Sequence, residues 1–530
     1  MSESTTSGSH SPLGRRSVLL GGAAAVGGAA LAGTTAGIAH AGSHGRPGAG
    51  VGRLKEPFAL GVASGDPLPT GIVLWTRLAQ DPTAPDGMGG MPNRTYPVLW
   101  EIAEDERFAR PVQRGRAWAS PEHGHSVHVE VDGLRPGAEY FYRFRVGNEV
   151  SPTGRTRTAP PPGHLGDLTL CFASCSHFGQ GYFTAYRRMA EEEPGLIMHL
   201  GDYQYEYAAA DDDVRTVAGP ETKTLANYRQ RHAQYKTDPD LQLAHSVAPW
   251  LVVWDDHETE NNWADEVPEE PQENFLKRRA AAFKAYYENM PLRSGARPDG
   301  IDMQLYRRIR WGGLANFHML DTRQYRDDQP CGDGYNKECP ERFDPDRTIT
   351  GQRQENWILD GFRKTDARWD VLGQQVFFSK LDLTAGPGEG YNMDSWDGYV
   401  ANRDRIAHAM ADSNVRNGVV FTGDVHQHWA AEIRDSHEHP DSPPAGTEFV
   451  TTSITSGGDG SGEPQQGVVD DNPHVKFNQD LRGYVRTRFS SEELRVDYRT
   501  LDYVSERGAP AKTEATFVVN DGEPRLNRRK

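Results

Sequence analysis

The chain has 530 residues, of which 36% are hydrophobic and 9% aromatic, and its 75 acidic and 58 basic side chains leave a formal net charge of −17. This length predicts more than one folded unit, and the composition supports a large core while excluding fibrous and integral membrane proteins. A surface of this sign repels a phosphate backbone at long range, so no nucleic-acid binding is expected.

Residues 1–41 have the order of a secretory signal. Arg15-Arg16 precedes an apolar run of small residues, and the run ends in Ala39-His40-Ala41, an A-x-A-like cleavage site. The paired arginines predict the twin-arginine export machinery as a partner. We therefore expect a secreted, extracellular protein whose mature chain contains no transmembrane segment.

The four cysteines fall into two pairs. Cys331 and Cys339 flank a polar loop, and in the oxidising environment outside the cell they are expected to form a local disulfide. Cys171 and Cys175 lie in and just after one apolar segment, where four residues of strand span about 13 Å, beyond disulfide reach. Cys171 is expected to be a small buried apolar residue, and Cys175 a metal ligand.

Short β-type segments follow one another over residues 56–158. Strands are predicted at 72–75, 98–102, 127–131 and 140–146, with no helical periodicity between them. This spacing predicts a β-sandwich, and residues 134–142 resemble the late strands of a fibronectin type III module. The proline-rich segment 160–163 is the predicted domain boundary.

Apolar strands alternate with helical segments over residues 164–520, which predicts a layered α/β domain. Strands are expected at 168–173, 196–200, 250–254, 314–320, 371–378 and 419–422, and helices at 181–192 and 274–289. The tail over 484–519 returns to β-type alternation.

Four of these predicted strands are followed directly by residues that can bind metal. The four segments are Ser174-Cys175-Ser176-His177, Gly201-Asp202-Tyr203-Gln204-Tyr205, Asp255-Asp256-His257-Glu258 and Gly423-Asp424-Val425-His426. Ligands of open α/β sheets bind beyond the carboxyl ends of the strands, so we expect these loops to converge. A thiolate and a phenolate favour a hard, highly charged ion such as Fe(III), and further carboxylates suit a second, divalent ion.

These motifs, with Leu320-Asp321-Thr322-Arg323, make the chain similar to the PhoD-type alkaline phosphatases and to the related actinobacterial metal-dependent phospholipases D. Both belong to the calcineurin-like metallophosphoesterases. The resemblance covers almost the whole mature chain. It implies an α/β fold with a layered metallophosphoesterase-type β-sandwich core flanked by helices, preceded by the fibronectin type III-like all-β domain.

The resemblance also implies a role for each matching residue. Fe(III) would be held by Cys175, Asp202, Tyr205 and His426. Ca(II) would be held by Asp202, Asp256 and Asp424. His257 would contact a phosphoryl oxygen and protonate the leaving group. A remaining histidine ligand of the wider superfamily has no clear counterpart here, and Gln374-Gln375 is the expected stand-in.

Two further residues are predicted to bind substrate. Arg323 is expected to hold a phosphate, since a guanidinium binds two oxygens at once, and an ion pair with a neighbouring carboxylate is the alternative for it. Asn262 follows the third metal-binding segment closely and is expected to reach the same site.

The predicted function is that of a secreted metal-dependent phosphoester hydrolase, in which metal-bound hydroxide attacks phosphorus at an Fe(III)/Ca(II) centre. The substrate would be a small phosphoester. One alternative is a phospholipase D that releases choline from phosphatidylcholine, with Tyr391, Trp396 and Asp397 receiving the quaternary ammonium. The other alternative is a secreted protein whose metal sites are structural and do not turn over substrate.

Overall fold

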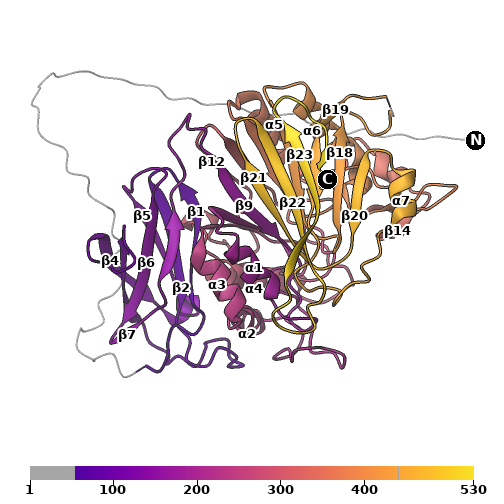
Figure 1. Ribbon diagram of the computed structural model, residues 1–530. Helices are drawn as coiled ribbons and strands as arrows, with labels where there is room; N and C mark the ends of the chain where they lie inside the picture. The colour runs from indigo at the N-terminus through magenta and orange to yellow at the C-terminus, as the bar shows by residue number, and fades with distance from the viewer. Residues whose placement is uncertain (1–53, 440, 530) are drawn as a thin grey trace, which may run out of the picture. The chain divides into compact units, whose positions relative to one another are not determined.

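The computed structural model describes residues 54–439 and 441–529, and these fall within one compact unit, residues 51–530. The predicted signal segment, residues 1–41, lies outside the described residues. Two large sheets dominate the described part, and a smaller sheet is formed by strands of its N-terminal part (Figure 1). No helix in the described residues is both long enough and apolar enough to cross a membrane.

The first large sheet has ten strands in the order β24-β23-β22-β21-β9-β10-β11-β1-β2-β5. Strands β9, β10 and β11 at its centre are parallel, and their carboxyl ends therefore lie at one edge. The bounds of all ten strands, in sheet order, are β24 Asn527–Arg529, β23 Ala511–Asn520, β22 Glu493–Leu501, β21 Gly483–Phe489, β9 Leu168–Ala173, β10 Leu196–Leu200, β11 Trp250–Val253, β1 Val62–Leu68, β2 Gly71–Arg77 and β5 Ser126–Asp132.

The second large sheet has seven strands in the order β12-β13-β15-β17-β19-β18-β20. Its four central strands, β13, β15, β17 and β19, are parallel. The bounds are β12 Arg307–Trp311, β13 Ala315–Met319, β15 Trp369–Gly373, β17 Gly418–Thr422, β19 Pro444–Val450, β18 His428–Arg434 and β20 Val475–Gln479.

The two large sheets pack face to face. Phe172 of β9 and Phe421 of β17 stack across the interface with ring centroids 4.3 Å apart. Successive strand residues point to opposite faces, so β17 contributes Val419 to the core between the sheets and Val420 to a separate core under helices. This burial on both faces explains the unbroken apolar runs that the sequence shows at the central strands.

Helices cover the outer faces of both sheets (Figure 1). Residues of α1 and α4 belong to the core of the first sheet, and residues of α5 and α6 pack on β15 and β17 of the second. The bounds are α1 Thr184–Glu191, α2 Leu225–Tyr235, α3 Pro239–Val247, α4 Phe275–Asn289, α5 Gly351–Lys364, α6 Val400–Ala411 and α7 Gln466–Asp471. The predicted α/β class and layered core are confirmed.

A smaller sheet contains β4, β3, β6 and β7, with β8 paired to β6. Its inner residues, such as Ile102 and Phe144, share one core with Ile72 and Leu74 of β2. The bounds are β3 Tyr96–Ala103, β4 Pro111–Ala119, β6 Glu139–Val146, β7 Glu149–Val150 and β8 Gly154–Arg157. Because β1 pairs in parallel with β11 at Gly65 and Trp250, β1, β2 and β5 also continue the first large sheet.

Cys331 and Cys339 form the predicted disulfide, with their Cα atoms 5.9 Å apart. The bridge lies near a two-stranded sheet of β14, Tyr335–Asn336, and β16, Tyr391–Asn392. Cys171 and Cys175 are both buried and free, as expected from their separation along β9 and the loop after it.

Candidate functional site

The loops after β9, β10 and β17 bring three metal-binding side chains together. The Cys175 sulfur, a carboxylate oxygen of Asp202 and a ring nitrogen of His426 all lie within 4.8 Å of one another. Tyr205 joins them, because its hydroxyl donates to Asp202 Oδ2 at 2.9 Å and lies 3.1 Å from His426 Nε2. These four residues are the set that the sequence resemblance assigns to iron.

Strained backbone orients these side chains and that of Asp424. Cys175, Asp202, Asp424 and His426 all have left-handed backbone, with φ of 61°, 54°, 57° and 59°. This conformation is unfavourable for residues other than glycine, and such strain is concentrated at functional sites. It turns the chain sharply at the end of each strand. At Gly201, where φ is 105°, an added Cβ would lie 2.4 Å from the Asp255 Cβ, so a side chain there would block the approach of the two loops.

Glu258 holds the strained segment in place. Its Oε2 accepts hydrogen bonds from the amides of Asp202 at 3.1 Å and Asp255 at 2.9 Å, and its Oε1 accepts from the Tyr203 amide at 2.7 Å. Burial raises the pKa of Glu258 to about 7, although the three N–H donors oppose that shift. The sequence motif contains Glu258, but only the fold shows that its partners are the amides beside a predicted ligand.

A second group lies beside the first and shares Asp202. It contains Asp202, Asp256 and His257, whose possible ligand atoms lie within 4.8 Å of one another. Asp256 is oriented by the amides of His257 and Asn262, which donate to its two oxygens at 2.9 and 2.8 Å.

Asp424 belongs to neither group in the described part of the chain. It is only partly buried and lines a cavity of about 260 Å³ whose walls include Phe377, Leu381 and Val425. The structure therefore brings Asp256 to the predicted second site and leaves Asp424 at its margin.

His257 is held between a carboxylate and an aromatic ring. Its Nδ1 lies 2.8 Å from Glu206 Oε2, and its ring centroid is 4.1 Å from that of Tyr205. Burial lowers the pKa of His257, but the Asp256, Glu206 and Asp202 carboxylates outweigh it and raise that pKa well above its usual value. Nε2 is the nitrogen left for a substrate oxygen or a metal. Glu206 was missed in the sequence, where its position directly after Tyr205 was the available signal.

Arg323 does not have the environment of a phosphate clamp. Its guanidinium is fully buried, and Nε donates to Asp255 Oδ1 at 2.6 Å. Nη1 and Nη2 donate to the two oxygens of Asp394, both at 2.8 Å. Because the guanidinium binds these two carboxylates in the interior, the geometry corrects the clamp prediction in favour of the ion-pair alternative.

Asn262 lies next to the site but faces another residue. Its side-chain amide donates to Asp333 Oδ2 at 2.7 Å, and its backbone amide donates to Asp256. Its contact with Asp256 is therefore through the backbone, and its substrate-binding role stays a prediction.

The glutamines proposed as a stand-in ligand are both used inside the core. Gln374 accepts from the Trp396 indole at 3.0 Å and donates to the Val376 carbonyl at 2.6 Å. Gln375 accepts from the Thr322 hydroxyl at 2.6 Å. Because the amide groups of both glutamines are bonded in this way, neither is available as a metal ligand, and the stand-in prediction is wrong.

The aromatic residues expected to receive choline are also occupied. The Arg342 guanidinium lies 4.0 Å from the centre of the Tyr391 ring, and Trp396 is fully buried. Asp397 forms an ion pair with Arg403 at 2.6 Å. A cation is already present at this ring and this carboxylate, so the three residues do not form an open ammonium site.

The donor set fits bound metal ions. Asp202 Oδ1 is buried with no hydrogen-bond partner, an arrangement that is costly for a carboxylate unless a cation binds it. Burial raises the pKa of the Asp202 carboxyl and of the Cys175 thiol well above their usual ranges, and a cation would favour the anionic forms of both. Sulfur, phenol, imidazole and carboxylate ligands around one point therefore suit a highly charged ion.

Comparison with known proteins agrees with this geometry. The family model described as "PhoD-like phosphatase" matches residues 170–498, and the model for the N-terminal domain of the same family matches residues 47–160. Alkaline phosphatase D of Bacillus subtilis (strain 168) is 47% identical over 482 residues, which cover 89% of this chain and 82% of that protein.

Two solved structures extend the comparison to the fold. A structure of PhoD has a TM-score of 0.86 and 47% identity, covering 89% of this chain and 92% of that one. A purple acid phosphatase from yellow lupin (Lupinus luteus) seeds has a TM-score of 0.52 at 12% identity, covering 87% of this chain and 73% of that one. At that identity the second likeness concerns the fold alone.

Proposed function

Since the chain belongs to the PhoD-like phosphatase family and is a phosphoric ester hydrolase, we propose that it hydrolyses phosphoesters outside the cell at a centre of Fe(III) and Ca(II). The observation that carries the proposal is the meeting of Cys175, Asp202 and His426 within 4.8 Å at the ends of three strands. Tyr205 completes this set through its hydrogen bond to Asp202.

Iron would be held by Cys175, Asp202, Tyr205 and His426, and calcium by Asp202 and Asp256, with Asp424 at the margin of the group. When bound, these ions supply the positive charge that attracts phosphoryl oxygens and lowers the pKa of a water molecule. The unpartnered Asp202 Oδ1 supports a shared ligand between the two positions.

His257 would act on the leaving group. Glu206 accepts at Nδ1, which keeps a proton on that nitrogen and fixes the ring, so that Nε2 is left to contact the reacting oxygen. A protonated imidazole in this position can donate its Nε2 proton to the departing alkoxide. The carboxylates that raise the His257 pKa favour that protonated form.

Extracellular action rests on residues 1–41, where paired arginines precede a small-residue apolar run. A twin-arginine signal would place the enzyme outside the cell, where the Cys331–Cys339 disulfide is stable. The phospholipase D alternative receives no support from Tyr391, Trp396 and Asp397, because all three are buried and arginines already contact Tyr391 and Asp397.

Phosphorus NMR of the purified enzyme, supplied with iron and calcium, tests the proposal. A phosphomonoester, a phosphodiester and phosphatidylcholine are offered in the same tube. We expect the soluble esters to be hydrolysed while the lipid signal stays unchanged. Phosphatidic acid appearing first would establish the phospholipase D alternative, and three unchanged substrate signals from a metal-loaded sample would refute the proposed centre.

A further inference from the structure

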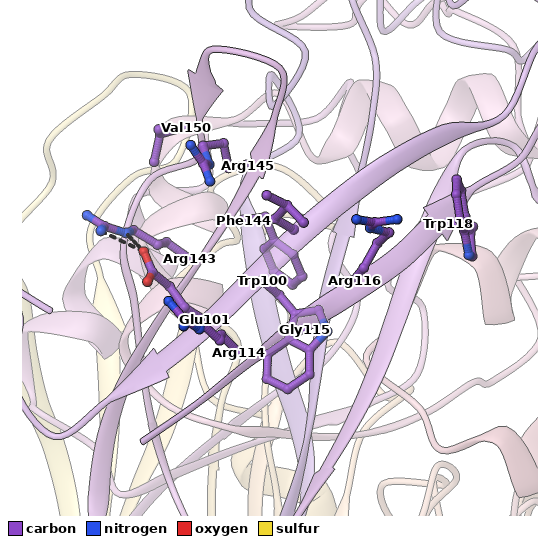
Figure 2. Close-up of a pocket in the computed structure, with 11 residues that line it drawn as sticks. Trp100, Glu101, Arg114, Gly115, Arg116, Trp118, Arg143, Phe144, Arg145 and Val150 are labelled. Carbon is purple, nitrogen blue, oxygen red and sulfur yellow. Dashed lines mark hydrogen bonds and ion pairs between the residues drawn. The ribbon is translucent and has the colours of Figure 1, made fainter. Parts of the chain in front are cut away.

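Rows of arginines cross the outer face of the small N-terminal sheet, whose strands precede all the metal-binding loops in the chain (Figure 2). In each row an arginine of β4 and an arginine of β6 flank one residue of the central strand β3. The two rows are Arg116–Leu99–Arg145 and Arg114–Glu101–Arg143.

Together these side chains line a trough of about 960 Å³. Neighbouring strands lie about 4.8 Å apart, so the β4 and β6 arginines start about 10 Å from one another across β3. Along one strand, residues two apart start about 7 Å from each other. An extended chain lying along β3 would therefore meet guanidinium groups on both sides and at successive positions.

The trough keeps a positive charge on a strongly acidic protein. Glu101 is the one acidic residue in its lining, and it is paired with Arg143 at 2.6 Å. Arg114, Arg116 and Arg145 have no acidic partner among residues 54–439 and 441–529. Because opposite charge attracts most strongly at short range, this local excess outweighs the net charge of −17 for a ligand lying in the trough.

The side chains of the trough also determine which hydrogen-bonding groups a ligand must present. A guanidinium has five N–H donors and no acceptor, so the arginine rows offer donors almost alone. Hydroxyl-rich glycans and extended peptides bring donors of their own, which would need acceptors that these rows lack. A phosphodiester chain presents acceptor oxygens at each repeat and matches the rows.

An exposed aromatic ring lies at one end of the trough. Trp118 of β4 is 58% exposed and is the one tryptophan among the large hydrophobic side chains exposed in the described residues. Its ring lies 5.9 Å from the Arg116 guanidinium, and Figure 2 shows the two side by side. Val150, 50% exposed, lies beside Arg145 at the other wall. An open indole beside a guanidinium is the surface on which nucleic-acid bases stack.

We propose that this trough binds single-stranded nucleic acid, with phosphates along the two arginine rows and a base on Trp118. The site is separate from the metal centre and goes beyond the hydrolysis proposed there. It also revises the expectation drawn from net charge, which describes the field far from the surface and not the field within this trough.

Fluorescence anisotropy of a labelled twelve-residue thymidine oligonucleotide, titrated with the holoenzyme at several salt concentrations, tests the proposal. The logarithm of the binding constant falls linearly with the logarithm of the salt concentration. For a single strand, each phosphate contact that is lost reduces the magnitude of this slope by about 0.7. We expect R114A/R116A to reduce the slope by about 1.4 and the affinity at 0.1 M salt by about 25-fold. R145A, on the opposite wall, should weaken binding about fivefold.

The matched control is R107A/R110A, which removes two exposed arginines of the same domain outside the trough. It should leave both slope and affinity unchanged. Equal losses in R114A/R116A and R107A/R110A, or no loss in R114A/R116A and R145A, would overturn the proposal.

Trp118→Ala distinguishes a base from other anionic repeats. It should weaken oligonucleotide binding about tenfold, because a stacked base is lost, while leaving inorganic polyphosphate binding unchanged. The nucleic-acid ligand would be refuted if polyphosphate bound as tightly as the oligonucleotide and Trp118→Ala left the binding of both unchanged. Anisotropy measures binding directly, and the variants are compared under the same conditions, so a failure of this proposal is distinguishable from a failure of the proposed hydrolysis. Release of phosphate from a small ester should be equal in all variants.

Discussion

The guanidinium of Arg323 donates to Asp255 and Asp394, two carboxylates that come from loops far apart in the sequence. All three side chains are buried, and the buried Arg326 guanidinium lies 3.1 Å from Asp394, so two positive groups face the two carboxylates in the interior. Removing one member leaves uncompensated charge, which costs about 3–5 kcal/mol for a buried pair. Asp255 precedes Asp256 directly, and the ion pair thereby supports the backbone of the second metal-binding group.

Arg323→Ala should therefore act on stability. We expect the free energy of unfolding to fall by about 3–5 kcal/mol while KM of the remaining folded enzyme stays unchanged. Urea denaturation followed by fluorescence, with steady-state kinetics on the folded fraction, measures both. A large rise in KM with unchanged stability would show that Arg323 binds phosphate after all.

Glu258→Gln should weaken metal binding without removing a ligand. The change replaces a carboxylate oxygen with an N–H donor facing backbone amides of Tyr203, or of Asp202 and Asp255. Each hydrogen bond to a charged acceptor stabilises the fold by about 1.5–3 kcal/mol. Without these bonds the strained turn at Asp202 would relax, and the Asp202 carboxylate would no longer be held in position for the metal. Iron content after dialysis, measured by mass spectrometry, should fall below that of the wild type.

Glu260→Gln is the control for that experiment. Glu260 lies two residues further along and pairs with the Arg278 side chain, with no contact to a ligand's amide. The Glu260→Gln variant should be less stable than the wild type but should retain its iron. Equal iron retention in both variants would contradict the anchoring role of Glu258.

Residue identity and strand position together predicted which candidate metal ligands lie close together. Cys175, Asp202 and His426 each follow a short apolar strand, and parallel strands bring such positions to one edge. The supporting carboxylates of Glu206 and Glu258 could not be placed in this way. Their partners are a ring nitrogen 51 residues away and amides of another loop, and only the tertiary structure specifies those contacts.

At the scale of elements, the strands and helices followed from periodicity. Strands β9 and β10 have the bounds predicted for them, and α4 begins one residue after the predicted start. The pairing of β1 with β11 was not predictable, because it joins strands nearly 190 residues apart through a short parallel contact. Local patterns specify an element and its buried face, but not which sheet edge it meets.

The Cys331–Cys339 disulfide closes a loop that carries Asp333, the partner of Asn262. We expect C331S/C339S to lower the free energy of unfolding by about 2–3 kcal/mol, since the unfolded chain gains the conformations that the bridge had removed. Guanidinium denaturation curves of the two proteins give this difference. Reduced wild type should match the double variant, and curves that coincide with oxidised wild type would refute a stabilising bridge.

At the scale of the whole molecule, charge is distributed unevenly. The net charge of −17 coexists with arginine rows on the small sheet and with buried carboxylates at the ends of β10 and β11. The carboxylate cluster is unfavourable by itself, because burial and mutual repulsion both oppose ionisation. Bound cations would remove that cost, so metal binding should stabilise the fold as well as supply the chemistry.

The metal content of two cysteine variants tests the central claim most directly. Cys175 lies at the proposed iron site, whereas Cys171 is an equally buried free cysteine four residues earlier in β9. We expect Cys175→Ala to lose its iron and at least about a hundredfold of phosphoester hydrolysis, because the ion that activates water is gone. Cys171→Ala should keep both. If Cys175→Ala retains iron and activity at the level of Cys171→Ala, the assignment of the metal centre is wrong.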